Sequence, residues 1–172
     1  MFNLINNFFN SSQNLKKVIS EFKILKRTSN VAKIFKIIEN HSDIAEIRYV
    51  GGCVRKIINE EKVDDIDLAT NLNPLEVREV LKKNEIKFYE TGIEHGTITA
   101  QIENERFEIT SLRSDVTTDG RHAKVQFTKD WFKDAERRDF TINAIYSDLN
   151  GNLFDPFGGA NDLKNGKLVF VG

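Results

Sequence analysis

Two acidic residues separated by one position, Asp65 and Asp67, are the first feature of this sequence that could do chemistry. Side chains two apart in a β-strand point to the same face, so these carboxylates would lie side by side where the apolar run 66–69 begins. Like charges this close repel each other unless a cation lies between them. Mg²⁺ prefers carboxylate and phosphate oxygens, and two such ions can activate a 3′ hydroxyl and stabilise a leaving pyrophosphate. The pair therefore predicts a metal site, although a solvated acidic turn is the commoner source of an isolated D-x-D.

A glycine pair lies where a strand would turn into a helix, in the segment GGCVR at residues 51–55. Backbone N–H groups at such a turn can bind phosphate oxygens, and glycine lets a ligand approach the backbone closely. Arg55 would add a charged hydrogen bond to the phosphate. The segment is neither a P-loop nor a G-x-G-x-x-G, and a plain strand-to-helix turn would have the same residues.

A basic pair precedes an Asp and an Asn further along the chain. Arg137 and Arg138 could contact a triphosphate, and Asp139 and Asn143 could contact a ribose. The last two residues are four apart, so on a helix they would share a face. An ordinary salt-bridged helix surface would show the same pattern, and the spacing alone leaves both interpretations open.

The elements that must position these residues follow from apolar periodicity and turn residues. Residues 1–30 are polar and Asn-rich and predict an arm, whereas residues 31–172 predict one folded domain. Strands are predicted at 47–50, 66–69, 87–91, 97–102 and 106–112, and helices at 30–41, 54–59 and 74–84. The polar stretch 114–126 predicts a loop, and 131–146 predicts a helix in one or two pieces. This order predicts an α+β fold with a mixed, mostly antiparallel sheet flanked by helices.

Composition bounds the partners that such a domain could have. The 172 residues contain 25 Lys and Arg against 26 Asp and Glu, a net charge of −1. Proteins that bind RNA along their whole surface are usually basic, so any RNA contact must be local or supplied by another region. Cys53 is the single cysteine, which excludes an intrachain disulfide and a CxxC metal site. This cysteine usage leads us to expect a cytoplasmic protein. There is no run of about 18 apolar residues, so we expect no membrane partner.

Taken in order, these segments resemble the class II tRNA nucleotidyltransferase and poly(A) polymerase family, which includes the CCA-adding enzymes. The family carries G-G-x-V-R, D-x-D, E-x-T-x-x-R, R-R-D-F-T-x-N-A and D-P-F-x-G. The matching residues here are 51–55, 65–67, 108–113, 137–144 and 155–159, and residues 92–97 are similar to the family's G-x-x-H-G-T turn. The matches cover nearly all of the family's head domain.

The resemblance implies a nucleotidyltransferase head related to DNA polymerase β, which uses Mg²⁺ to transfer CMP and AMP from CTP and ATP to RNA 3′ ends. It implies Asp65 and Asp67 as catalytic metal ligands and Glu108 as a third acidic group. The residues that we expect at the nucleotide are Gly51, Gly52, Arg55, Arg113, Arg137, Arg138, Asp139 and Asn143.

The sequence departs from the family in two places. Lys56 stands where the family usually has Asp, which adds positive charge near the phosphates. The sequence also stops at Gly172, where the family's neck would begin, so the neck, body and tail are absent from these residues. We therefore expect ATP, CTP and a tRNA 3′ end as partners, and a second protein chain for base selection and tRNA binding. A poly(A) polymerase head and a non-catalytic nucleotide- or RNA-binding remnant stay open as alternatives.

Overall fold

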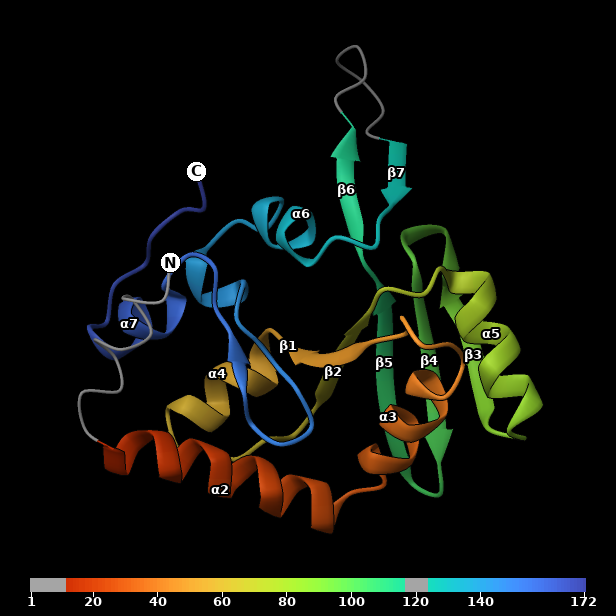
Figure 1. Ribbon diagram of the computed structural model, residues 1–172, viewed down its shortest axis with the longest axis horizontal. Helices are drawn as coiled ribbons and strands as arrows, with labels where there is room; N and C mark the ends of the chain where they lie inside the picture. Colours follow the sequence, from red (N-terminus) through yellow and green to blue (C-terminus); the bar gives the residue numbers. More distant parts are fainter. Residues whose placement is uncertain (1–11, 117–123) are drawn as a thin grey trace.

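A seven-stranded mixed sheet forms the centre of the molecule (Figure 1). The computed structural model describes residues 12–116 and 124–172. The strand order is β3-β4-β5-β2-β1-β8-β9. The bounds are β1 Ile47–Val50, β2 Ile66–Thr70, β3 Lys87–Gly92, β4 Thr97–Ile102, β5 Glu105–Ser111, β8 Tyr146–Ser147 and β9 Leu153–Phe154. Within this described sheet β2 and β5 pair in parallel and the other neighbours are antiparallel, which confirms the predicted fold class.

Helices flank this sheet. Their bounds are α2 Ser12–Thr28, α3 Val31–Glu39, α4 Gly52–Ile58, α5 Pro74–Lys83, α6 Trp131–Glu136 and α7 Gly159–Lys164, with 3-10 turns η1 Ile93–His95 and η2 Thr141–Asn143. The start of α5 shows why the sequence places it there. The Asn73 side chain accepts a hydrogen bond from the backbone N–H of Glu76, whose carboxylate in turn accepts from the backbone N–H of Asn73. This reciprocal cap satisfies two N–H groups that the first helical turn would leave unpaired.

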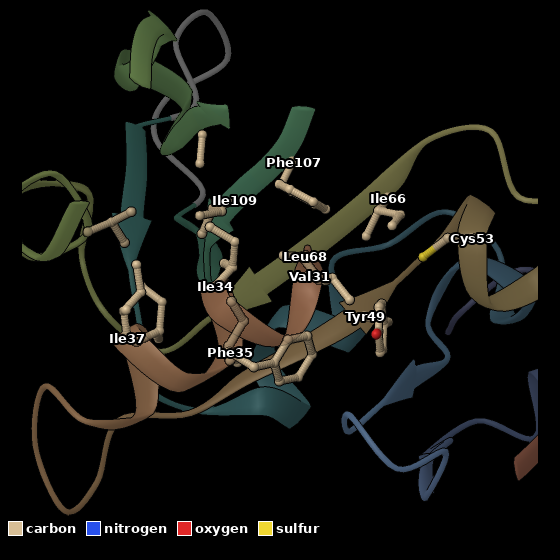
Figure 2. Close-up of a cluster of buried hydrophobic side chains, with 14 of the residues drawn as sticks. Val31, Ile34, Phe35, Ile37, Tyr49, Cys53, Ile66, Leu68, Phe107 and Ile109 are labelled. Carbon is tan, nitrogen blue, oxygen red and sulfur yellow. The ribbon is translucent and has the colours of Figure 1, made fainter. Parts of the chain in front are cut away.

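One face of the sheet packs against helices and forms the main core. Figure 2 shows side chains of α3 lying against those of the central strands. The strand residues that face this core include Ile66 and Leu68 of β2 and Phe107 and Ile109 of β5. Because side chains alternate along a strand, Asp67 and Glu108 must point to the opposite face. The fold thus separates a buried apolar face from a face that can carry charge.

The expectation of a polar arm before residue 31 is wrong for the part that the structure describes. Residues 12–28 form α2, whose Val18 and Phe22 are buried in the main core. The Phe22 ring lies 5.1 Å from the ring of Tyr49 in β1. Val18, Phe22 and Leu25 recur at helical spacing, so one stripe of a mostly polar helix is enough to dock it. Residues 1–11 lie outside the described residues.

The loop predicted at 114–126 is also wrong in part. Arg113–Val116 form β6 and Lys124–Phe127 form β7, and these strands pair as a separate two-stranded antiparallel ribbon. The ribbon projects from the body of the domain near α6 (Figure 1). The central part of the predicted loop, 117–123, lies outside the described residues. None of the described helices combines the length and apolar character needed to cross a bilayer.

The helix predicted at 131–146 breaks early. α6 ends at Glu136, and Phe140 is extended with φ −118° and ψ 146°. Phe140 forms a β-bridge with Phe170, and its ring lies 4.8 Å from the Phe170 ring. The second helical piece is only the 3-10 turn η2, and β8 begins at Tyr146. Pairing of Phe140 with the C-terminal segment thus replaces the middle of the predicted helix.

Candidate active site

Two carboxylates lie side by side at the centre of the open sheet face. β2 and β5 run in parallel register with Asp67 opposite Glu108. Asp67 is half-buried and Glu108 is exposed, and Asp65 lies exposed one residue before β2 begins. Glu108 faces away from Phe107 and Ile109, because both of those side chains are fully buried in the core.

Charges of both signs converge on Asp67. Burial raises the pKa of the Asp67 carboxyl, and the negative charges of Glu108 and Asp65 raise it further. The guanidinium groups of Arg138 and Arg55 act in the opposite direction, but the net pKa remains raised. A carboxylate whose ionised form is disfavoured in this way gains most from a nearby cation.

The glycine turn leaves space beside this carboxylate. Gly51 has φ 67° and ψ −127°, a conformation that residues with a side chain rarely adopt. A Cβ atom added to Gly52 would lie 3.9 Å from Nη2 of Arg55 and 4.0 Å from Oδ2 of Asp67. The hydrogen at this position keeps the space between guanidinium and carboxylate open. A phosphate there would lie between the Arg55 guanidinium on one side and the Asp67 carboxylate on the other.

Asp65 and Asp67, the residues expected at a metal, would supply only part of the ligands of a Mg²⁺ ion, and the substrate would supply others. Among the described residues, no group of three or more His, Cys, Asp or Glu side chains is placed to hold a metal by itself. A cation here would take oxygens from Asp65 and Asp67 and complete its shell with phosphate and water. This division is usual for Mg²⁺, which keeps waters and binds through one or two carboxylates plus substrate phosphates.

A hydrogen-bonded chain fixes Arg55 at the edge of the site. Its Nη1 donates to Oδ1 of Asn143, and Nδ2 of Asn143 donates to Oδ1 of Asp139 at 2.8 Å. The bond from Asn143 and the backbone N–H of Phe140 lower the pKa of Asp139. Asp139 and Asn143 do meet, but the helix that was to place them on one face is absent. They meet across an extended residue and a 3-10 turn instead.

Asp134 is the residue that sequence reasoning missed. Its side chain is only 1% exposed and accepts hydrogen bonds from Nη2 of Arg138 at 3.1 Å and from the Tyr146 hydroxyl at 2.7 Å. Nη2 of Arg137 lies 2.9 Å from its other oxygen. Burial raises the pKa of Asp134, but the charges of Arg138 and Arg137 outweigh it and hold this pKa low. The spacing i, i+3 and i, i+4 to two arginines was the available signal.

This cluster gives the two arginines different positions. Arg137 is turned inward, with Nε 3.1 Å from the backbone oxygen of Arg113 and 3.0 Å from Oδ1 of Asp134. Arg138 binds Asp134, Tyr146 and the backbone oxygen of Asn143, and its charge also acts on Asp67. Arg138 is therefore brought to the carboxylate centre, whereas the contacts of Arg137 belong to the support beneath it.

Arg113 lies where β6 leaves the main sheet. Its backbone N–H donates to Oδ1 of Asp134 at 3.1 Å, and its Nη1 donates to the backbone oxygen of His95 at 3.2 Å. These contacts connect the base of the β6–β7 ribbon to the same buried carboxylate that holds Arg138. The structure thus joins Arg113 to the support of the site.

The D-P-F-x-G segment has a structural explanation. The buried Asp155 carboxylate accepts hydrogen bonds from the backbone N–H groups of Gly159 at 2.8 Å and Ala160 at 2.9 Å. A Cβ atom on Gly159 would lie 2.1 Å from the backbone oxygen of Thr141, so only glycine fits there. The segment packs α7 tightly against η2, the turn that carries Asn143.

Lys56, the departure from the family pattern, pairs with a neighbouring acid. Its Nζ lies 3.0 Å from Oδ2 of Asp64, and this hydrogen bond raises the pKa of Lys56. Asp64 directly precedes Asp65. The added positive charge of Lys56 is therefore paired with Asp64, just before β2 begins.

Comparison with known proteins assigns this arrangement to a class. The chain belongs to the family of poly A polymerase head domains, whose match extends over residues 47–169. That range begins at β1 and contains every residue predicted for the site. The resemblance seen in the sequence motifs is thereby confirmed.

The named relatives within this similarity are CCA-adding enzymes. The chain is 53% identical over 135 residues to human "CCA tRNA nucleotidyltransferase 1, mitochondrial", covering 78% of this chain and 30% of that protein. It is 38% identical over 129 residues to the "CCA-adding enzyme" of Lactobacillus johnsonii, covering 74% and 31%. The chain thus spans about three tenths of the length of these relatives.

Solved structures support the same fold. The Bacillus stearothermophilus CCA-adding enzyme in complex with CTP aligns with a TM-score of 0.71 and 29% identity, over 81% of this chain and 32% of that one. A tRNA nucleotidyltransferase complexed with a primer tRNA and an incoming ATP analog aligns with a TM-score of 0.61 and 26% identity, over 79% and 39%.

Proposed function

We propose that this domain is the catalytic head of a tRNA CCA-adding nucleotidyltransferase, which transfers CMP and AMP from CTP and ATP to an RNA 3′ end using Mg²⁺. The observation that carries the proposal is the convergence of Glu108, Asp65, Arg138 and Arg55 on the half-buried Asp67. Acidic groups to hold a cation and basic groups to hold phosphate lie around one point. The names of the relatives favour CCA addition over poly(A) addition.

The proposed roles follow from the geometry. Asp65 and Asp67 hold Mg²⁺, which when bound lowers the pKa of the attacking 3′ hydroxyl and stabilises the leaving pyrophosphate. Glu108 keeps the centre acidic from the neighbouring strand. Arg55 and Arg138 bind the triphosphate in the space that Gly52 leaves open.

The nucleotide is proposed to extend from this centre toward η2. Asn143 holds the Arg55 guanidinium and is itself held by Asp139, so these two residues orient the phosphate contact while they contact the ribose. Gly51 gives the turn its shape. Arg113 and Arg137 act from beneath through Asp134, which makes them positioning residues.

Base selection and tRNA binding are proposed to need residues beyond these 172. The relatives are about three times longer than the aligned region, and the net charge of −1 gives this domain little general affinity for RNA. The second protein chain expected from the sequence stays a prediction. So does the cytoplasmic location, since the human relative carries a mitochondrial name.

The first test is Mg²⁺-dependent nucleotide binding, measured by calorimetry. We expect the protein to bind ATP and CTP with little discrimination, and Asp67→Asn to weaken this binding at least tenfold, because a lost charged interaction costs about 1.5–3 kcal/mol. Asp43→Asn removes the same charge from an exposed position outside the site and should change nothing. Equal affinities for the wild type and Asp67→Asn would refute the assignment.

A second test asks what the domain does alone. Correct positioning of reactants can account for roughly 7–11 kcal/mol of a barrier, and the body of the tRNA, which fixes where its 3′ end lies, is proposed to be held by parts beyond this domain. We expect these 172 residues alone to incorporate labelled CTP and ATP into tRNA lacking its 3′ end very poorly. Addition of a chain that carries neck, body and tail should restore incorporation. Efficient ordered addition of C, C and A by the domain alone would contradict this.

A further inference from the structure

The open face of the sheet continues beyond the acidic centre as an ordered row of side chains. Asp67 lies opposite Glu108, Glu108 opposite Thr99, and Thr99 opposite Tyr89. Residues directly opposite each other in neighbouring strands share a face. The row therefore runs across β2, β5, β4 and β3 from the carboxylates to an aromatic ring. Three strand spacings of about 4.8 Å place that ring about 14 Å from Asp67.

A second, basic row flanks the first. Arg106 lies opposite Gln101, and Gln101 opposite Lys87. Cζ of Arg106 is 5.5 Å and Nζ of Lys87 is 5.4 Å from the centre of the Tyr89 ring. The Tyr89 hydroxyl donates to Oε1 of Gln101 at 3.0 Å, which holds the ring against the sheet. An aromatic ring with two cations beside it thus stands on the same face as the site.

These side chains are accessible and have no part in the core. Lys87 and Arg106 are exposed and Tyr89 is half-buried, whereas the alternate residues Ile98, Ala100 and Phe107 point into the main core and are buried. Burial therefore accounts for one face of β3, β4 and β5 and leaves the aromatic and basic residues of the other face unexplained.

We propose that Tyr89 and the basic row beside it bind the single-stranded 3′ end of the RNA that receives the nucleotide, an inference that rests on the proposed function. A base stacks on the Tyr89 ring, and Arg106 and Lys87 bind the adjoining phosphates. Aromatic rings on an open sheet, next to cations that follow the backbone, are how many proteins hold single strands. The distance from Asp67 assigns Tyr89 to a nucleotide upstream of the reacting hydroxyl.

The direct test measures binding of a fluorescent six-nucleotide single-stranded RNA by anisotropy at low salt. Tyr89→Ala should weaken binding about fivefold or more, as expected for loss of one stacked base. Tyr89→Phe keeps the ring and loses only the bond to Gln101, so it should bind within about twofold of the wild type. Duplex RNA of the same sequence should bind more weakly than the single strand.

The cations are tested through the salt dependence. Each phosphate contact to a single strand contributes about 0.7 to the slope of log K against log salt. Arg106→Ala and Lys87→Ala should each reduce the slope by about that amount. Arg27→Ala and Lys23→Ala remove the same charges from exposed positions of α2, which packs on the core side, and should leave the slope unchanged. Arg106 is exposed, so its variant remains informative if Tyr89→Ala unfolds.

Mg²⁺-dependent ATP binding by the same variants separates the two proposals. We expect Tyr89→Ala and Arg106→Ala to bind Mg²⁺-ATP like the wild type. A wild type that does not bind single-stranded RNA, or variants that bind it like the wild type, would overturn the inference about this row. Equal binding of duplex and single strand would overturn it too. If the wild type binds single-stranded RNA but does not bind Mg²⁺-ATP, the proposed function would be overturned instead.

Discussion

Strands β2 and β5 have two faces with different roles: alternate residues of the same segments face the apolar core on one side and the candidate site on the other. On one face Leu68 and Phe107 are fully buried beneath helices. On the other, one position away, Asp67 and Glu108 bring two negative charges together. The first face belongs to the main apolar core, and the second holds charged groups that repel each other. Residues for stability and residues for chemistry thus alternate along the same strands, because successive side chains point to opposite faces of the sheet.

The largest effect should come from comparing neighbours on opposite faces. Phe107→Ala should destabilise the domain by about 3–5 kcal/mol, because it removes a fully buried ring from the core. Glu108→Gln should change stability by no more than about 0.5 kcal/mol, as expected for an exposed residue. Urea unfolding of both variants gives the comparison. Similar losses in the free energy of unfolding for the two variants would mean that both faces contribute equally to stability.

A slightly smaller effect tests whether the charged face has a buried support. Asp134→Ala should cost about 3 kcal/mol, because it leaves the Arg137 and Arg138 guanidiniums without the carboxylate that compensates them. Mg²⁺-ATP affinity should fall as well, since Arg138 loses its anchor. Asp130→Ala changes an acidic N-cap of the same helix and should cost about 1 kcal/mol with little effect on nucleotide affinity. If both variants lose stability equally, Asp134 is an ordinary helix residue.

The smallest effect concerns the strain at Asp67 itself. The pKa of Asp67 is higher in the folded state than in the unfolded state. The protonated carboxyl therefore stabilises the folded domain at pH values below the ordinary Asp pKa. This stabilisation is lost as pH rises through the folded-state pKa. Asp67→Asn should therefore raise stability at pH 7 without metal and flatten this decline. Since Asp67 is partly solvated, the gain should stay below about 1 kcal/mol. Thermal unfolding between pH 3 and 7 checks the sign; destabilisation at pH 7 would contradict it.

Much of the sheet could be predicted from the sequence because its strands are short apolar or alternating runs between clear turn residues. The prediction for 97–102 matches β4, and the prediction for 47–50 matches β1. The β6–β7 ribbon could not be predicted in this way. Its polar strands pair mainly with each other, so they lack the periodicity that burial imposes. The prediction of a polar arm was wrong for residues 12–28 for a related reason: a few apolar side chains are enough to pack a largely polar helix against the core.

The candidate site was predictable where residues recur in fixed motifs and unpredictable where they act through contacts between distant segments. Asp65, Asp67, Arg55 and Arg138 follow from type and order. Asp134 lies outside the family motifs, and only its i, i+3 and i, i+4 spacing to Arg137 and Arg138 pointed to its role. Local pattern predicted a helix in one or two pieces over 131–146, whereas long-range pairing of Phe140 with Phe170 keeps the middle of this segment extended.

The parallel pairing of β2 with β5 also has a consequence for the order in which the domain forms. β2 and β1 can pair early, as can the meander of β3, β4 and β5, because each set is close in sequence. Bringing β5 beside β2 closes a long loop, and contacts of high sequence separation are slow to form. The pairing that brings Asp67 opposite Glu108 belongs to this late step. We therefore expect the acidic centre to be among the last parts of the described domain to acquire its native geometry during refolding, after most of the secondary structure has formed.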